Sequence, residues 1–355
     1  MITKNTVFRT NPNYKIMTSS ELVTLFPKFE PYYRYNNNSF LLLHKKHIHP
    51  NHAIQLDLAT VNYLFSCEEP TKILSKSTTN ISLIKSLVLD QVLQIKDKNE
   101  EYVSGSTCFE SLSRKYNHSS SINAIKHAWF FKESPLEEIV EKLYSYGMMP
   151  MHYSLQEKLE HPTNVIEWVD SKKIDSFLQN YDFTPISDEN KYWFYWQRKN
   201  IDRKEDLPFK LYVSPEPKDL PFVFRKVAET SIKLSAPIFK LGSTSSGIHR
   251  PDKMVMYFKN WEELNSFAQS LLPSIENCKS QRVPFTYSLS PNGLLSYGIE
   301  PEDDDSVSFR IYISKLIAKT LKLYSFENST LNINDILLKL NLNGIQTKKW
   351  TDYVN

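Results

Sequence analysis

The most constraining feature of the sequence is a change of pattern near position 190. Beyond it, short apolar and aromatic runs alternate with longer amphipathic runs, which predicts strands alternating with helices. The expected strands are 191–197, 209–214, 238–241 and 253–258, and the expected helices are 220–234, 261–272 and a last one from Ser306 or Ser308 through Leu323. Asn260 and Glu263 supply a capping box for the second of these helices. The C-terminal half is therefore predicted to be an α+β domain with a small mixed or antiparallel sheet.

The first 190 residues show a different pattern. Positions 1–80 contain only short apolar runs and are expected to be irregular. Helices are expected at 82–97, where apolar residues recur at helical spacing, and at 119–131. A third helix is expected after Ser134, a candidate N-cap that a proline and then a glutamate follow, and Gly147 is expected to close it. This half is therefore predicted to be mainly helical.

These patterns divide the chain into two predicted domains. We place a mainly helical domain at 1–195 and the α+β domain at 196–355, with the charged stretch 198–206 (RKNIDRKED) as a linker or a hairpin tip. Hydrophobic residues make up 41% and aromatic residues 13% of the 355 residues, which is enough for proper cores and too much for a disordered chain. The formal net charge is only +3, so we expect neither a nucleic acid nor a membrane as partner.

Cysteine usage and hydropathy indicate the compartment. The three cysteines, Cys67, Cys108 and Cys278, are far apart and form no CxxC motif, which favours free thiols in a reducing compartment over disulfides or a cysteine zinc site. The N-terminus lacks an apolar segment of signal-peptide length, and no stretch approaches the roughly 20 apolar residues of a membrane span. We therefore expect a soluble cytoplasmic protein, with secretion as an effector as the alternative, because such export signals are not visible in composition.

Two clusters of potential metal ligands are better explained as solvated turns. The four histidines at 44–52 have ligand-like spacing, but two lysines add repulsive charge and Pro50 interrupts any regular element, whereas zinc needs four ligands in tetrahedral geometry. The acidic run at 300–305 lacks the alternating oxygen spacing and the turn glycine of a calcium-binding loop. We therefore expect a basic turn and an acidic loop, and no metal site.

The strongest chemical signal lies at 239–258 (FKLGSTSSGIHRPDKMVMYF). Lys240 ends a predicted strand, a loop rich in glycine and hydroxyl residues follows, and His249, Arg250 and Lys253 precede the next strand. Backbone N–H groups, hydroxyls and an arginine in such a loop suit a phosphate or another oxyanion, and the alternative is a polar surface loop with incidental positive charge. The sequence contains no P-loop motif, no GxGxxG, no GxSxG and no HExxH, which removes several common enzyme classes.

Short stretches of this half also carry a family resemblance. They are 209–217 (FKLYVSPEP), the helix after it, 239–241 (FKL), 249–258 (HRPDKMVMYF), 283–301 (VPFTYSLSPNGLLSYGIEP) and 308–321 (SFRIYISKLIAKTL). In this order they resemble the HopA-type effector family, which includes the lyase partners of class V lanthipeptide and thioamitide gene clusters. That family is similar to the OspF-type phosphothreonine lyases and to the lyase domains of class III and IV lanthipeptide synthetases. The resemblance spans positions 207–321, and 1–190 contain no motif of this kind.

The resemblance implies a β-elimination that needs no metal or cofactor. A phosphorylated serine or threonine in a precursor peptide loses phosphate and becomes dehydroalanine or dehydrobutyrine, after a separate kinase-like protein has supplied the phosphate. Lys240 is then the base that removes the weakly acidic Cα proton, which requires a lowered pKa. Arg250 and Arg310 are the implied phosphate ligands, and Lys253 and Lys315 are weaker candidates.

One position departs from the family. The OspF-type enzymes use a histidine on the strand before the helix as general acid, whereas here 209–212 reads FKLY. Lys210 and Tyr212, which share one face of the strand, and His249 are the candidates for the acid, and phosphate is a good enough leaving group for the step to proceed without one. Two alternatives stay open, namely a non-catalytic module that binds a phosphorylated or anionic partner, and a secreted effector that acts on host signalling proteins. The N-terminal half is a candidate for binding the precursor peptide or the kinase.

Overall fold

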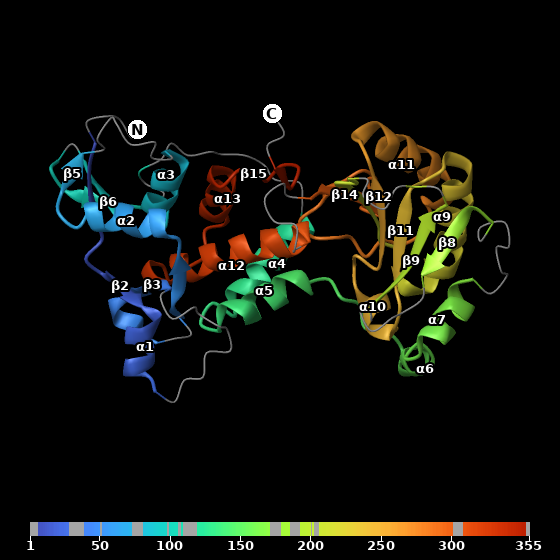
Figure 1. Cartoon of the computed structure of the whole chain (residues 1–355), viewed down its shortest axis with the longest axis horizontal. Coiled ribbons are helices and arrows are strands. Elements are labelled where there is room, and N and C mark those ends of the chain that lie inside the picture. The colour runs from blue at the N-terminus through green and yellow to red at the C-terminus, as the bar shows by residue number, and fades with distance from the viewer. Residues whose placement is uncertain are drawn as a thin grey trace. The chain divides into compact units, whose positions relative to one another are not determined.

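The computed structural model describes residues 6–27, 39–49, 52–72, 81–97, 99–105, 108, 119–170, 179–184, 192–199, 201, 206–300 and 308–352. The chain forms two compact units, each assembled from segments that are distant in the sequence (Figure 1). Unit 1 comprises Met1–Asn117, Ile125–Tyr144 and Ile313–Thr347, and unit 2 comprises His118–Ala124, Ser145–Tyr312 and Lys348–Asn355. The predicted division at residue 195 falls inside unit 2, in strand β9 (Trp193–Arg198).

Unit 1 contains two small antiparallel sheets, with strand orders β5-β1-β6-β7 and β2-β3-β4. Their strands are β1 (Val7–Thr10), β2 (Tyr14–Thr18), β3 (Phe40–His44), β4 (Ile54–Leu56), β5 (Thr71–Lys72), β6 (Leu93–Lys96) and β7 (Tyr102–Val103). The expectation of irregular structure at 1–80 is therefore wrong for the described part of that range; positions 1–5, 28–38, 50–51 and 73–80 lie outside it. These strands are short and obtain their hydrogen bonds from distant partners, as Phe8 does from Ile95, so local pattern does not reveal them.

Helices supply the rest of unit 1. They are α1 (Ser19–Leu25), α2 (Leu58–Ser66), α3 (Ile81–Leu89), α5 (Leu136–Tyr144), α13 (Ile333–Leu342), and parts of α4 (Ser119–Trp129) and α12 (Phe309–Glu327). The predicted helices at 119–131 and after Ser134 are confirmed, and Gly147 follows α5 with a φ of 87°. The predicted helix at 82–97 is correct only in its first half, because Gln91 turns the chain with a φ of 64° and the next residues join the sheet as β6.

Unit 2 is built on one seven-stranded antiparallel sheet with the order β13-β14-β10-β12-β11-β9-β8. Besides β9, its strands are β8 (Tyr181–Thr184), β10 (Phe209–Val213), β11 (Ile238–Gly242), β12 (Met254–Phe258), β13 (Tyr287–Ser288) and β14 (Leu295–Ile299). All four strands predicted beyond position 190 are therefore present, although Lys191 and parts of the predicted linker, 200 and 202–205, lie outside the described residues. The predicted α+β class is confirmed.

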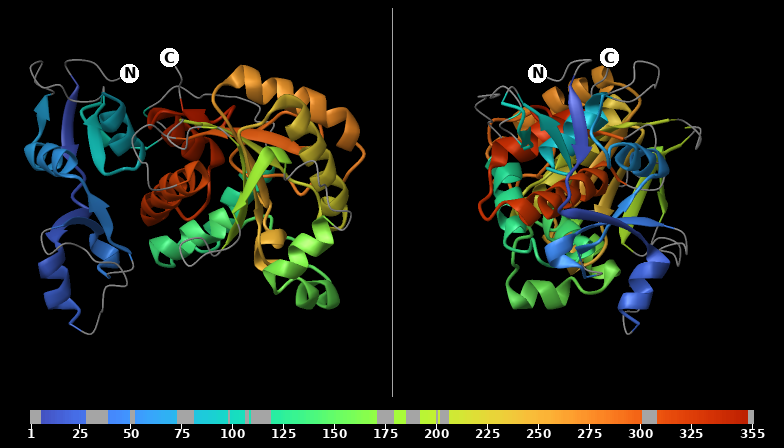
Figure 2. Two further views of the ribbon diagram at one scale, coloured as in Figure 1. Left: turned by 45° about the vertical axis from the view of Figure 1, so that its right-hand side comes forward. Right: turned by 90° about the vertical axis from the view of Figure 1, so that its left-hand side faces the viewer.

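Helices α9 (Leu220–Leu234) and α11 (Trp261–Ile275) pack with the apolar face of this sheet, and α7 (Pro162–Val169) packs against α9 (Figures 1 and 2). Besides the remaining parts of α4 and α12, the described helices of unit 2 include α6 (Tyr153–Lys158) and α10 (Ser245–His249). Two short strands, β15 (Ile345–Gln346) in unit 1 and β16 (Thr351–Asp352) in unit 2, end the described chain. The predicted helices at 220–234 and 261–272 are confirmed, and the Asn260 side chain caps α11 by accepting from the Glu263 backbone N–H at 2.9 Å.

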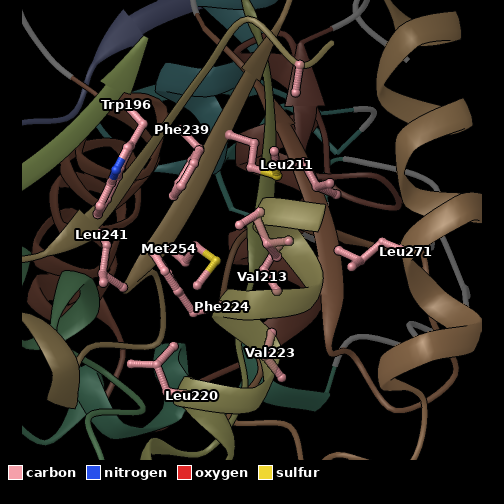
Figure 3. Close-up of a cluster of buried hydrophobic side chains, with 14 of the residues drawn as sticks. Trp196, Leu211, Val213, Leu220, Val223, Phe224, Phe239, Leu241, Met254 and Leu271 are labelled. Carbon is pink, nitrogen blue, oxygen red and sulfur yellow. The ribbon is translucent and has the colours of Figure 1, made fainter. Parts of the chain in front are cut away.

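Strand alternation gives the sheet one apolar face and one polar face. Leu211, Phe239, Met254 and Trp196 point into the core together with side chains of α9 and α11 (Figure 3). The Trp196 and Phe239 rings stack at a centroid distance of 4.6 Å and an angle of 8°. The residues between them in sequence therefore point to the opposite face, and that face carries the candidate site.

The loop after β11 is held by a close backbone approach. A Cβ on Gly242 would lie 2.7 Å from the backbone of Gly247, so only glycine allows α10 to pack against the end of β11. The predicted last helix is confirmed as α12, which runs on to Glu327, while Ser306 lies outside the described residues. Among the residues that the structure describes, no helix has both the length and the hydrophobicity needed to cross a bilayer.

Candidate active site

The polar face of the sheet brings together residues from its three central strands. Lys210 on β10 pairs in register with Tyr257 on β12. One row further along, Tyr212 on β10 and Lys240 on β11 lie on either side of Val255 on β12. Neighbouring strands are about 4.8 Å apart, so this register places the two lysines within reach of one substrate. The sequence had pointed to each lysine separately, and the structure puts them on one surface.

Lys240 occupies an aromatic and cationic environment. Its Nζ lies 4.3 Å from the ring centroid of Trp193 on the neighbouring strand β9 and 5.4 Å from that of Tyr257. Burial, and then the positive charges of Lys210 and Arg250, lower the pKa of Lys240 to about 8, while nearby carboxylates act in the opposite direction. The lowered pKa that the proposed base requires therefore has an identifiable cause in the fold.

Lys210 is buried and forms an ion pair with Glu300. Its Nζ pairs with Oε1 of Glu300, which follows directly after β14, and lies 5.3 Å from the Tyr257 ring centroid. Burial raises the pKa of Tyr257 well above its ordinary value, so this phenol keeps its proton at neutral pH. The side-chain amines of Lys210 and Lys240 thus both lie near the ring of a neutral tyrosine.

Arg250 and Arg310 meet at Asp252. Arg250 donates from Nε to Oδ1 and from Nη2 to Oδ2 of Asp252, both at 2.9 Å, and Arg310 Nη1 lies 2.6 Å from Oδ2. The Arg250 guanidinium also lies 5.2 Å from the Trp193 ring centroid. Although burial acts to raise it, the two arginines hold the pKa of Asp252 well below its usual range.

Lys253 belongs to the framework behind this cluster. Its side chain is fully buried, and Nζ donates to the carbonyl of Pro215 at 2.8 Å and to Oε1 of Gln281 at 2.6 Å. Gln281 in turn donates to the carbonyls of Gly147 and His249, both at 2.6 Å. Burial lowers the pKa of Lys253 to about 7. The structure therefore gives this candidate phosphate ligand two protein partners and no accessible surface.

The remaining candidates lie at the edge of the cluster or away from it. His249 bonds through Nδ1 to the carbonyl of Met149 at 2.6 Å, which fixes its ring in the loop. Tyr212 is buried in an apolar group with Val255 and Val283. Lys315 is exposed on α12 and belongs to unit 1, whereas the other candidates belong to unit 2.

Four residues of the cluster were absent from the sequence-based candidates, namely Trp193, Tyr257, Asp252 and Glu300. Asp252 and Tyr257 lie inside the motif HRPDKMVMY, and strand alternation from Val255 would have placed Tyr257 on the polar face. Glu300 had been assigned to a solvated acidic loop, but it pairs with Lys210; positions 302–305 of that run lie outside the described residues. Trp193 carries no local signal, because only the pairing of β9 with β11 brings it to Lys240.

The histidine turn of unit 1 is solvated only in part. His47 and His49 are exposed, but His44 is buried, accepts from the Lys46 backbone N–H at 3.2 Å and lies 3.3 Å from Glu327. Among the described residues, no group of three or more His, Cys, Asp or Glu side chains has a geometry that would hold a metal ion. The three cysteines are free thiols, and Cys67 is buried.

No protein-family model and no curated protein matches this chain. Solved structures give matches of low similarity. The effector protein from Pseudomonas syringae pv. tomato is 15% identical, with 66% of this chain and 97% of that chain covered and a TM-score of 0.41. The phosphothreonine lyase OspF from Shigella flexneri is 12% identical (46% and 90% covered, TM-score 0.30). The phosphothreonine lyase effector VirA (SpvC) from Chromobacterium violaceum is also 12% identical (59% and 99% covered, TM-score 0.31).

Proposed function

We propose that this protein is a lyase that eliminates phosphate from phosphoserine or phosphothreonine in a peptide. The base removes the Cα proton, its electron pair forms the Cα–Cβ double bond, and the Cβ–O bond breaks to release phosphate and leave dehydroalanine or dehydrobutyrine. The observation that carries the proposal is a lysine of lowered pKa, Lys240, beside Lys210 and Arg250 on one polar sheet face. A base next to cations is what the proton abstraction and the departing phosphate both require.

Lys240 fits the role of base because enough of it is neutral. With a pKa of about 8, roughly a tenth of the side chain is neutral at pH 7, about 300 times more than for a lysine with the ordinary value of 10.5. The Trp193 ring at 4.3 Å covers the amine and limits its hydration. The same covering orients Nζ, which matters because the Cα proton is abstracted only from a well-placed base.

The charge of the cluster suits a phosphate monoester. With Lys240 neutral, as its role as base requires, three cationic groups face the two carboxylates of Asp252 and Glu300, a surplus of one positive charge. A phosphate monoester carries between about 1.5 and 2 negative charges near pH 7. Arg250 keeps a fifth of its side chain exposed and is the proposed phosphate ligand.

Lys210 is the proposed proton donor in place of the missing histidine. Among the three candidates, Tyr212 is buried among apolar side chains and His249 is fixed to the Met149 carbonyl. Lys210 lies on the polar face next to Tyr257, and its pairing with Glu300 keeps its ammonium group oriented. The same ammonium group is placed to stabilise the enolate that develops when Lys240 takes the proton.

The biological setting follows from the family resemblance of the sequence. We propose a phosphorylated precursor peptide of the lanthipeptide type as substrate, with a separate kinase as partner and a place of action in the cytoplasm. The N-terminal region is proposed to bind the peptide or the kinase. The second candidate function is a non-catalytic module that binds phosphorylated partners, which the absence of the strand histidine favours. The third is an effector that acts on host signalling proteins.

Phosphopeptides test this proposal directly. Matched peptides with phosphoserine or phosphothreonine are incubated with the protein, and mass spectrometry follows the loss of phosphoric acid while a thiol traps the alkene. We expect elimination by the wild type, none by Lys240→Ala, and full activity in Lys226→Ala, which changes a partly exposed lysine on α9 that pairs with Glu229. Binding without elimination supports the binding module, hydrolysis to serine or threonine contradicts both, and an unchanged rate in Lys240→Ala removes Lys240 as base.

A further inference from the structure

One buried carboxylate organises both arginines of the cluster. Arg250, from the loop before β12, binds Asp252 through two parallel hydrogen bonds of 2.9 Å. Arg310, from the first turn of α12, approaches the same carboxylate at 2.6 Å and also donates from Nε to the carbonyl of Pro284 at 3.2 Å. Two segments that are far apart in the sequence are thereby joined through Asp252.

The three side chains differ in accessibility. Arg310 is 1% exposed and Asp252 6% exposed, whereas Arg250 is 20% exposed. A phosphate group must reach a guanidinium to bind it, so only Arg250 offers a surface for a direct contact. The sequence had assigned the same role to both arginines, and the burial separates them.

We propose that Asp252 and Arg310 are positioning residues, which fix the guanidinium of Arg250 over Trp193, so that of the two arginines only Arg250 contacts the phosphate. The proposal rests on the function proposed above for the identity of the ligand. An arginine has several rotatable bonds and loses about 2 kcal/mol of rotamer entropy when it is fixed. The bidentate contact with Asp252 fixes it before a ligand arrives, and Arg310 keeps the buried carboxylate ionised and in place.

Geometry and electrostatics make opposite predictions for Asp252→Asn, an isosteric change. If Asp252 acts only as a negative charge, its removal strengthens the binding of an anion. If it positions Arg250, the variant binds inorganic phosphate more weakly, and we expect a loss of about tenfold, in the range of one well-oriented charged hydrogen bond. Isothermal titration calorimetry with phosphate measures the effect without turnover. Tighter or unchanged binding in Asp252→Asn overturns the proposal.

A double-mutant cycle separates the role of Arg310 from direct binding. Arg310→Gln is expected to weaken phosphate binding about tenfold in the wild type and less than about twofold in the Asp252→Asn background, because Arg310 acts through Asp252. Additive losses would show that Arg310 contacts phosphate itself and would overturn the proposal. If melting curves show that Arg310→Gln does not fold, Arg310→Lys replaces it in both backgrounds, since lysine keeps the charge but cannot contact Asp252 and Pro284 together.

The readouts also separate this proposal from the proposed function. Phosphate binding with the expected cycle but without elimination from phosphopeptides refutes the lyase and leaves the arginine arrangement intact. Elimination with additive losses refutes the arrangement and leaves the lyase intact.

Chemical rescue supplies a last check. Guanidinium at about 10–50 mM, enough to occupy a site of millimolar affinity, is expected to restore activity in Arg250→Ala and not in Arg310→Ala. The reverse result contradicts the assignment.

Discussion

Removing either of two charges near Lys240 is predicted to shift the pKa of Lys240, in opposite directions for the two variants. Lys210 lowers the pKa of Lys240 and Glu300 raises it. The Nζ atoms of Lys210 and Lys240 lie 5.3 and 5.4 Å from the Tyr257 ring centroid and are thus at most about 11 Å apart. At that distance and an effective dielectric constant of about 20, two unit charges interact by about 1.5 kcal/mol, which corresponds to roughly one pH unit. Since this distance is an upper limit, we expect Lys210→Met to raise the pKa of Lys240 by at least about this amount and Glu300→Gln to lower it.

Both shifts can be measured with and without catalysis. The kcat/KM for phosphate elimination is expected to rise with pH as Lys240 loses its proton, with the midpoint near pH 8 in the wild type. The midpoint moves to higher pH in Lys210→Met and to lower pH in Glu300→Gln, whereas Lys226→Met on α9 leaves it unchanged. Competitive acetylation with peptide mass spectrometry reports the pKa of Lys240 even in an inactive variant. Shifts of the same sign in both variants would refute the electrostatic reasoning.

Three further predictions concern stability. Burial, and then the charge of Lys322, lower the pKa of His52 from 6.5 to about 4, so the unfolded chain takes up this proton first as the pH falls. Because solvent screens this half-buried group, we expect a loss of stability of about 1 kcal/mol between pH 6.5 and 4. Urea unfolding at both pH values measures the loss, and His52→Gln is expected to reduce it. Phe239→Ala is expected to lower the free energy of unfolding in urea by about 3–5 kcal/mol, because the side chain is fully buried. The control Phe222→Ala, at a residue that is 46% exposed, is expected to change it by less than about 0.5 kcal/mol. Gly242→Ala is expected to lower the melting temperature and the elimination rate together, because its Cβ would meet the α10 backbone at 2.7 Å; a rate loss without a change in melting would contradict a packing effect.

The strands and helices beyond position 190 could be predicted because their signals are local. Short apolar and aromatic runs identified β10 and β12, and the Asn260 cap with its amphipathic run identified α11. The strands of unit 1 lacked such signals, since short runs such as 40–44 become strands only through pairing with distant partners. The same cause ended the predicted helix at 82–97 early, where the pairing of Ile95 with Phe8 outweighs helical spacing.

The candidate site was predictable to the extent that it lies in one motif. The stretch from Lys240 to Lys253 supplied the proposed base and an arginine, and the structure places Lys240 and Arg250 around the same Trp193 ring. Sequence alone did not reveal that Lys253 is buried against the Pro215 carbonyl or that Glu300 reaches Lys210, because both contacts join segments that the sheet register brings together. Residue type indicated the candidates, and the structure adds which of them are accessible and which are buried.

The proposed reaction has two conflicting requirements: Lys240 needs a low pKa, and an anionic phosphate must bind beside it. The cations of the cluster suit both. In the free protein, the charges of Lys210 and Arg250 help to lower the pKa of Lys240 and so enlarge its neutral fraction. A phosphate placed beside Lys240 acts in the opposite sense, because an anion favours the protonated amine and would disable the base when the substrate arrives. In the proposed complex, cations that bind the phosphate would offset its charge and preserve the neutral fraction of Lys240 that the elimination requires. A basic cluster around a lysine of lowered pKa therefore favours the proposed elimination over phosphate binding alone, since a module that only binds phosphate has no need to lower the pKa of one of its lysines.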